Sequence, residues 1–297
     1  MAILFPILIY AVVALAVYGS YASSAHTTNE PMSACHISEK LGHDDDDRGL
    51  IVAGTACYTI SKTSITQHSI RNDGVLVGAR TARFHDHDRI KHMRGGVLVG
   101  ENIYVCNSPD TDQHQFNTIE VFDKHLNHKY HINLSGGSGV LMAIDFCDGR
   151  LWGCLSYPGD RDGYSMMVEI MHGTVAHTQK HKSERSEYHP PTWTIRSRFI
   201  IPEFGDHLDT SDIVWVSFGP DKLLYVVFRG DSTKIYRMRL HYTSPELSAV
   251  DTIDTVAHYD RFTRHTTKKQ LLCGIPKTNA SRIEFMHVNE MDELVYQ

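Results

Sequence analysis

The sequence repeats one pattern, two short apolar segments joined by a tight turn, and this repetition limits the folds open to the chain. The clearest copy is residues 139–156, GVLMAIDFCDGRLWGCLS, in which Asp148 and Gly149 supply the turn. An Asp-Gly pair between apolar runs is a strong signal for a β-hairpin. Further copies occur at 213–228 and 283–296. A hairpin that recurs along the chain indicates an all-β protein.

A further hairpin is expected at 96–107. This hairpin and those at 139–156 and 213–228 each continue into two further apolar segments, which makes sets of four strands. Polar turns separate the strands at the spacing of about 8 to 12 residues that is typical of sandwiches, barrels and propellers. Four strands that repeat as a unit are typical of a propeller blade. The sequence therefore predicts a β-propeller of four-stranded blades, three of which span 96–134, 139–178 and 213–253.

The number of blades follows from the aromatic residue in each second strand. Tyr104 and Trp152 are one blade apart, whereas the next steps, to Tyr225 and Tyr296, are about half as long again. The longer steps hold either polar insertions or a degenerate blade, and six blades are favoured over five. Because the chain stops inside what reads as a second strand, we expect the N-terminal strands within 50–70 to complete the last blade, which would remove an open sheet edge.

Three stretches of the chain match parts of the repeating unit of one known propeller family. In that unit an apolar strand is followed by an acidic turn, an L-Y-V-like strand and an I-x-V-F-D strand. The matching residues are Ile144-Asp145 with 148–152 (DGRLW), 220–226 (PDKLLYV) and 119–123 (IEVFD). In these residues the chain resembles the NHL and gluconolactonase-type (SMP-30-like) six-bladed β-propellers over about half of its length.

The resemblance implies a scaffold without the family's catalytic site. Lactonases of that family hold a divalent metal near the central channel through a Glu of an E-G-P-x-W segment, together with Asn and Asp from later blades. The segments E-G-P-x-W, R-P-N-G and S-D-G are all missing from the expected places in this chain. The fold that the resemblance implies therefore does not by itself predict the function of this chain.

The amino terminus predicts export. Residues 3–17 are apolar and uncharged, are shorter than the roughly 20 residues of a membrane span, and are followed by small residues. We interpret 1–25 as a signal peptide, 26–49 as a polar, acidic, disordered leader and 50–297 as the propeller domain. The expected location is extracellular or the lumen of the endomembrane system, with no membrane contact beyond the signal sequence. Tethering by an uncleaved signal anchor is the alternative.

Known catalytic signatures are missing. The acidic run 44–47 before Arg48 resembles the activation peptide of trypsinogens, but no GDSGG-like or AAHC-like motif follows, which excludes a serine protease. The chain also has no HExxH, CxxC, GxSxG or phosphate-loop motif. An enzyme would need residues assembled from distant loops, so a binding role is favoured.

Acidic residues follow the second strand of several predicted blades. In a propeller these loops lie on one face, and a ring of carboxylates would suit Ca²⁺ or Mg²⁺. Simple turn chemistry is the alternative explanation. The metal candidates are Asp110, Asp112, Asp160 and Asp162.

One of these loops reads Arg229-Gly230-Asp231-Ser232 and resembles the RGD loop that integrins recognise. At the tip between two strands it would be presented to a partner, so these residues are the candidates for partner binding. Gly-Asp is also ordinary turn chemistry, which is the alternative.

The histidines and cysteines of the chain are candidates for metal sites and for disulfides. The chain has 20 histidines, with clusters at 85–88 and at 125–131, but both clusters fall in predicted turns and are interpreted as solvated.

Cys106 and Cys154 lie two residues after the aromatic markers of neighbouring blades, so they would approach each other or stay as buried thiols. Asn133 and Asn279 begin N-x-[ST] sequons, which fit a secretory route.

Charge limits the class of partner. The formal net charge is −6, with acidic and basic residues interspersed, so no nucleic acid is expected. The predicted function is a secreted or lumenal propeller acting as a binding module for a protein or small molecule that the sequence does not name. The alternative is a divalent-metal-dependent hydrolase of the lactonase or esterase kind with a diverged site.

Overall fold

The computed structural model describes the chain from Asp47 to Tyr296 with gaps. The described residues are 47–84, 90, 92–108, 117–136, 139–157, 164–172, 191–202, 213–219, 221–228, 231–244, 246–255, 259–264, 266, 271–276, 278–288 and 294–296. The regular structure in these ranges is all strand, and they contain no helix that is long and apolar enough to cross a lipid bilayer.

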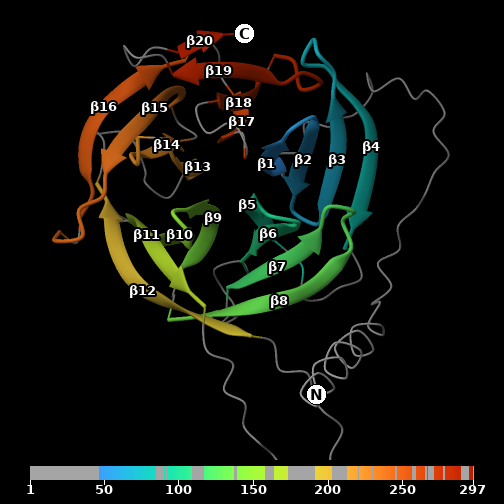
Figure 1. The fold of residues 1–297 in the computed structure, drawn as a ribbon. Helices are drawn as coiled ribbons and strands as arrows, with labels where there is room; N and C mark the ends of the chain where they lie inside the picture. The colour runs from blue at the N-terminus through green and yellow to red at the C-terminus, as the bar shows by residue number, and fades with distance from the viewer. Residues whose placement is uncertain are drawn as a thin grey trace, which may run out of the picture.

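The strands follow one another around a ring (Figure 1). In chain order they are β1 (Asp47–Ala53), β2 (Ala56–Ser61), β3 (Ser64–Ile70), β4 (Leu76–Arg83), β5 (Met93–Val99), β6 (Asn102–Asn107), β7 (Thr118–Asp123), β8 (His128–Ser135), β9 (Val140–Cys147), β10 (Arg150–Tyr157), β11 (Tyr164–Met171), β12 (Thr192–Ile201), β13 (Ile213–Phe218), β14 (Leu224–Phe228), β15 (Asp231–Arg239), β16 (Ser248–Asp254), β17 (Tyr259–Arg264), β18 (Leu271–Pro276), β19 (Glu284–Val288) and β20 (Leu294–Tyr296).

The pairing of these strands gives five antiparallel blades of four strands. β1–β4, β13–β16 and β17–β20 each form a separate four-stranded sheet. The remaining eight strands form one sheet in the order β5-β6-β7-β8-β12-β11-β10-β9, which is two further blades joined by short parallel pairing of their outer strands. The innermost strands β1, β5, β9, β13 and β17 contact one another around the central axis. The predicted fold class, an all-β propeller of four-stranded blades, is confirmed.

Residues 139–156, the clearest copy of the repeated pattern, form a hairpin of β9 and β10, as predicted. Asp148 and Gly149 both have positive φ, 50° and 76°, as a two-residue type I′ turn requires. The turn places Arg150 opposite Cys147, so the β9–β10 register follows from local chemistry.

The predicted completion of the last blade by residues 50–70 is wrong. β1, β2 and β3 pair with β4 and make the first blade, while β17–β20 make the last blade from C-terminal residues alone. The prediction failed because it assigned Tyr296 to a second strand. In the structure Tyr296 belongs to the fourth strand of the last blade, β20. The second strand of that blade is β18, which lacks an aromatic marker.

The described strands form five blades, where the sequence favoured six. The long step from Trp152 to Tyr225 contains, among the described residues, only the two outer strands of the third blade and the first strand of the fourth. The fourth strand of that third blade is β12 at 192–201. The segment predicted for it, 174–178, lies outside the described residues, as do the predicted signal peptide and all but the last three residues of the leader 26–49, since β1 begins at Asp47.

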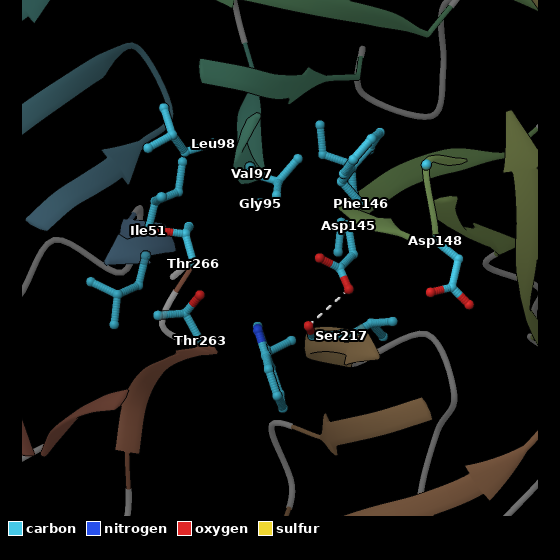
Figure 2. Close-up of a pocket in the computed structure, with 18 residues that line it drawn as sticks. Ile51, Gly95, Val97, Leu98, Asp145, Phe146, Asp148, Ser217, Thr263 and Thr266 are labelled. Carbon is cyan, nitrogen blue, oxygen red and sulfur yellow. Dashed lines mark hydrogen bonds between the residues drawn. The ribbon is translucent and has the colours of Figure 1, made fainter. Parts of the chain in front are cut away.

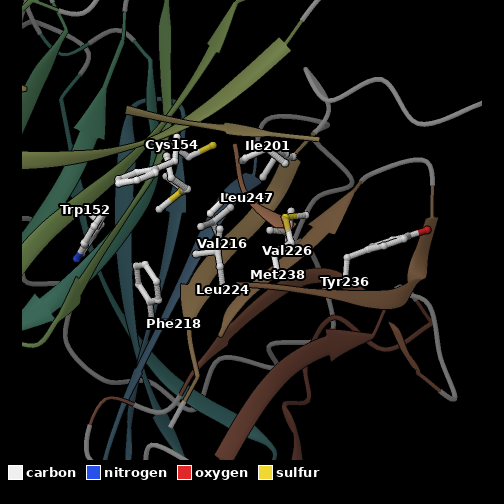
Figure 3. Packing of buried hydrophobic residues seen from close by; sticks show 14 of the residues in the cluster. Trp152, Cys154, Ile201, Val216, Phe218, Leu224, Val226, Tyr236, Met238 and Leu247 are labelled. Atoms are coloured by element: carbon white, nitrogen blue, oxygen red, sulfur yellow. The ribbon is translucent and has the colours of Figure 1, made fainter. Parts of the chain in front are cut away.

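Apolar side chains pack in the gaps between neighbouring blades. Figure 3 shows the cluster between the third and fourth blades, where the Trp152 and Phe218 rings lie 5.1 Å apart, centroid to centroid. Burial of one large apolar side chain contributes about 1.5 to 3 kcal/mol, so each gap adds substantially to the stability of the ring. The core is therefore divided among the blade-to-blade contacts.

Candidate functional site

Most site residues predicted from the sequence fall outside the described chain. This holds for the four metal candidates, Asp110, Asp112, Asp160 and Asp162, and for Arg229 and Gly230 of the RGD segment. Asp231 is the first residue of β15, and its backbone pairs with Phe228 of β14. The metal ring and the integrin-like loop therefore stay predictions. Where the structure does describe the chain, no three His, Cys, Asp or Glu residues gather closely enough to hold a metal ion.

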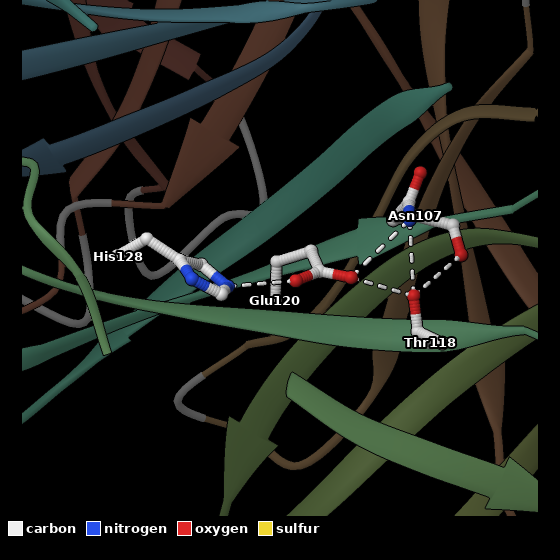
Figure 4. A network of polar contacts seen from close by, with 4 residues as sticks. All are labelled: Asn107, Thr118, Glu120 and His128. Carbon is white, nitrogen blue, oxygen red and sulfur yellow. Dashed lines mark hydrogen bonds and ion pairs between the residues drawn. The ribbon is translucent and has the colours of Figure 1, made fainter. Parts of the chain in front are cut away.

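The interpretation of the histidines at 125–131 as solvated turn residues is wrong for His128 and His131, which lie in strand β8. His131 is buried there, and His128 joins a buried polar network in the second blade (Figure 4). Glu120 of β7 is fully buried, and its Oε2 lies 2.8 Å from Nε2 of His128 in β8. Its Oε1 accepts hydrogen bonds from Thr118 Oγ1 at 2.7 Å and from Asn107 Nδ2 at 3.2 Å. The network connects the three outer strands of one blade, so we assign it a structural role. The cluster at 85–88 lies outside the described residues.

The ionisation of Glu120 follows from these contacts. Burial opposes the charged carboxylate, but the hydrogen bonds from His128 and Thr118 more than offset it, so the pKa of Glu120 is below its ordinary value. The buried carboxylate is therefore charged at neutral pH and fully engaged with its own blade.

A pocket of about 280 Å³ opens along the central channel and is lined by the innermost strand of every blade (Figure 2). Its location agrees with the usual place of ligand sites in closed β-structures, where the ends of several strands converge. The lining residues are Gly49, Leu50, Ile51, Gly95, Gly96, Val97, Leu98, Ala143, Ile144, Asp145, Phe146, Asp148, Gly149, Trp215, Val216, Ser217, Thr263 and Thr266.

Small residues allow the inner strands to converge at this point. A Cβ atom on Gly49 of β1 would lie 2.8 Å from the carbonyl oxygen of Arg94 in β5, and one on Gly95 of β5 would lie 3.1 Å from Cα of Ala143 in β9. A side chain at either position would push neighbouring inner strands apart. Gly49 and Gly95 thus allow β1, β5 and β9 to approach one another closely beside the pocket.

Asp145 is the buried carboxylate of this pocket. Its Oδ2 accepts a hydrogen bond from Ser217 Oγ and another from the backbone N–H of Phe218, both at 2.8 Å. These bonds connect β9 of the third blade to β13 of the fourth. The second carboxylate, Asp148, is exposed on the β9–β10 turn and lies 3.6 Å from Lys222 Nζ.

The other walls of the pocket are apolar, aromatic and hydroxylic. Phe146 is 37% exposed, whereas Trp215 is buried. Thr263 and Thr266 lie across the pocket from the two aspartates (Figure 2). Among the lining residues that the structure describes there is no Lys, Arg, His or Cys. The pocket therefore offers carboxylate and hydroxyl oxygens beside apolar walls, and one hydroxyl, that of Ser217, is hydrogen-bonded to the Asp145 carboxylate.

The sequence alone does not predict this pocket. Asp145 fits the blade pattern in the sequence, and its hydrogen-bond donors Ser217 and Phe218 are more than 70 positions away in the chain. One signal was present: an acidic residue inside an otherwise apolar innermost strand needs a polar partner. In the structure, β13 of the neighbouring blade supplies it.

The two sequons differ in their surroundings. Asn133 is half-buried in β8, whose backbone pairs with β7 on one side and β12 on the other. Asn279 is exposed in the turn between β18 and β19, and Ser281 Oγ donates a hydrogen bond to its Oδ1 at 2.8 Å.

Comparisons with known proteins identify no family. No family model matches the chain, and no curated protein matches it. Solved structures with a similar course of the chain include hydrazine synthase of Kuenenia stuttgartiensis, with 10% identity, a TM-score of 0.45, and coverage of 87% of this chain and 99% of that one. A putative 6-phosphogluconolactonase from Bacteroides fragilis has 11% identity, a TM-score of 0.42 and coverage of 84% and 82%.

The periplasmic gluconolactonase PpgL of Pseudomonas aeruginosa is similar to the same degree, with 9% identity, a TM-score of 0.42 and coverage of 84% of each chain. At such identities and scores no function is transferred from these proteins. The assignment as a propeller rests on the strand order and pairing of this chain.

Proposed function

We propose that this protein is a binding module whose central-channel pocket takes a small neutral or cationic ligand. The observation that supports the proposal is the pocket itself, which draws on the innermost strand of every blade and has only carboxylates, Asp145 and Asp148, as charged lining groups. A site built from rigid inner strands is pre-organised, which lowers the entropic cost of binding.

The chemistry of the lining selects the ligand class. The negative charge of Asp145 repels phosphates and carboxylates, and the described lining contains no lysine or arginine, although Lys222, outside the lining, pairs with the exposed Asp148. An ammonium group would be attracted both by the carboxylates and by the aromatic rings of Phe146 and Trp215. A volume of about 280 Å³ suits a small organic molecule and not a polymer.

The second candidate function is the metal-dependent hydrolase. In the described part of the pocket, Asp145 already accepts two hydrogen bonds from the fourth blade, which commits it to holding β9 against β13. The hydrolase therefore depends on Asp110, Asp112, Asp160 and Asp162, outside the described residues. Metal-dependent turnover of lactones or aryl esters that is lost in Asp110→Asn or Asp160→Asn would favour this second function.

A thermal-shift screen of the full-length chain tests the binding site. We expect small amines, quaternary ammonium ions or polyols, and not carboxylates of the same size, to raise Tm. A ligand at about 100 times its Kd adds about 2.7 kcal/mol of stability, which is a shift of several degrees. Thr266→Trp would fill the pocket and abolish the shift.

The matched control is Thr252→Trp, which adds the same side chain at an exposed position of β16. This variant is expected to keep the ligand-induced shift. If both variants keep it, or if carboxylates are the ligands that stabilise the chain, the proposed site is wrong.

Export is part of the proposal, and it rests on the predicted signal peptide 1–25. Of the two sequons, Asn279 has the exposed side chain that a glycan needs, so we expect an N-linked glycan there when the chain passes through a eukaryotic secretory pathway. Enzymatic removal of N-glycans should increase the gel mobility of wild type and of Asn133→Gln, and not of Asn279→Gln. Retention of the unglycosylated chain inside the cell would contradict export.

A further inference from the structure

Two buried cysteines meet where the first and last blades close the ring. Cys57 lies in β2 and Cys273 in β18, the second strands of the first and fifth blades. Both side chains have no exposed surface. They belong to one apolar cluster, whose other buried members are Leu50, Val52, Leu76, Ile275 and Ile283.

The alternation of side chains along each strand shows that the two thiols face the same gap. The neighbour of Cys57, Tyr58, packs in the cluster that joins the first blade to the second. The neighbour of Cys273, Leu272, packs in the cluster that joins the fifth blade to the fourth. Successive residues of a strand point to opposite faces, so Cys57 points towards the fifth blade and Cys273 towards the first.

The closing interface, defined here as the contact between the first and fifth blades, is held without strand exchange. Each blade keeps its own four strands. Three backbone hydrogen bonds connect the described residues of the two blades. Leu76 N–H donates to Ser281 O, Ile283 N–H to Gly74 O, and Thr266 N–H to Val52 O. A covalent bond at this interface would therefore join the two ends of the propeller domain.

We propose that Cys57 and Cys273 form a disulfide that closes the ring covalently when the chain folds in an oxidising compartment. The inference rests on the proposed export for its setting, since disulfides persist in such compartments. Both thiols lose their protons, and the two sulfurs together give up two electrons to a disulfide oxidant such as oxidised glutathione, which becomes two thiols. Disulfides between facing sheets occur in the same way in antibody domains.

Burial determines when the bond can form. Desolvation raises the pKa of the Cys57 thiol to about 12, and desolvation together with the neighbouring Cys57 raises that of Cys273 well above its ordinary value. Because the thiolate is the nucleophile in exchange, the folded, reduced pair is nearly inert. The bond must therefore form during folding, before the closing interface excludes the oxidant, and afterwards it is shielded from reductants.

Cys106 and Cys154 provide an internal comparison. Like Cys57 and Cys273, both are buried free thiols in the structure, and Cys154 contributes to the raised pKa of Cys106 as Cys57 does to that of Cys273. What separates the two pairs is the face of the blade to which each side chain points. Cys106 packs in a cluster with residues of the second and third blades, whereas Cys154 packs in the cluster between the third and fourth. These two side chains therefore occupy different gaps, and we expect no bond between them, in contrast to the approach that their sequence positions suggested.

The test is a thiol map of the full-length chain refolded in a glutathione redox buffer, which does not depend on export. The protein is denatured without reductant, alkylated, digested and analysed by mass spectrometry. We expect a Cys57–Cys273 linked peptide and alkylated Cys106 and Cys154. Alkylation of Cys57 and Cys273, or a different pairing of either, would overturn the proposal.

A second measurement, of Tm, tests the disulfide if the chain refolds poorly in the redox buffer. In protein purified from a secretory host, unfolding followed by reduction and refolding without oxidant should lower Tm in wild type and in Cys154→Ala, and should leave the Tm of Cys57→Ala unchanged. An equal response of all three would refute the disulfide. A chain that forms the bond in the redox buffer but is not exported would refute only the proposed export.

Discussion

At the scale of single residues, His68 shows how burial controls ionisation in this ring. It lies in β3 with 3% of its surface exposed, and its Nε2 is 3.3 Å from Thr59 Oγ1. Desolvation lowers the pKa of His68 to about 4, from an ordinary value of about 6.5. Between these values the unfolded chain binds a proton that the folded chain excludes, so stability is lost as the pH falls from about 6.5 to about 4.

The predicted loss from His68 is up to about 3 kcal/mol, since each pKa unit corresponds to about 1.4 kcal/mol. Urea unfolding at pH 7 and at pH 4.5 measures it. His68→Gln should flatten the decline, while His241→Gln, at an exposed position, should leave it unchanged. If His68→Gln and wild type lose stability in parallel, His68 is not the group that titrates.

At the scale of elements, the contact between β9 and β13 depends on Asp145. Asp145→Ala would remove a buried acceptor of two hydrogen bonds and leave the Phe218 N–H unsatisfied, at a cost of the order of 3 kcal/mol. Ser217→Ala would remove one donor and cost about 1 kcal/mol. Equilibrium unfolding in urea measures both, and equal costs would show that the carboxylate does not join these blades.

The elements that the sequence predicts correctly are those with local causes. The hairpin around Asp148-Gly149 follows from turn chemistry and the apolar runs beside it, and both its turn and its register are confirmed. β12 was missed because, as an outer strand, it alternates exposed and partly buried residues over much of its length and so lacks an apolar run. Tyr296 was assigned to the wrong strand because an aromatic residue alone does not distinguish β20 from a second strand.

At the scale of the whole molecule, the blade number and the closing interface depend on contacts between distant parts of the chain. Leu50 and Ile283 pack in one cluster although they come from opposite ends of the domain. No local pattern encodes such a contact, which is why closure by strand exchange was predicted wrongly. The pocket could not be predicted for the same reason, since its lining extends from Gly49 to Thr266.

The most direct test of the binding proposal uses the fluorescence of Trp215. The chain has three tryptophans, and of these Trp215 lines the pocket. A variant with Trp152→Phe and Trp193→Phe keeps Trp215 as its only tryptophan, and titration with the small amine or polyol that most raises Tm reports on the pocket. Our account predicts a saturable change in emission that disappears when Thr266 is replaced by a bulky leucine. Stabilisation by the ligand without any change at Trp215 would contradict it.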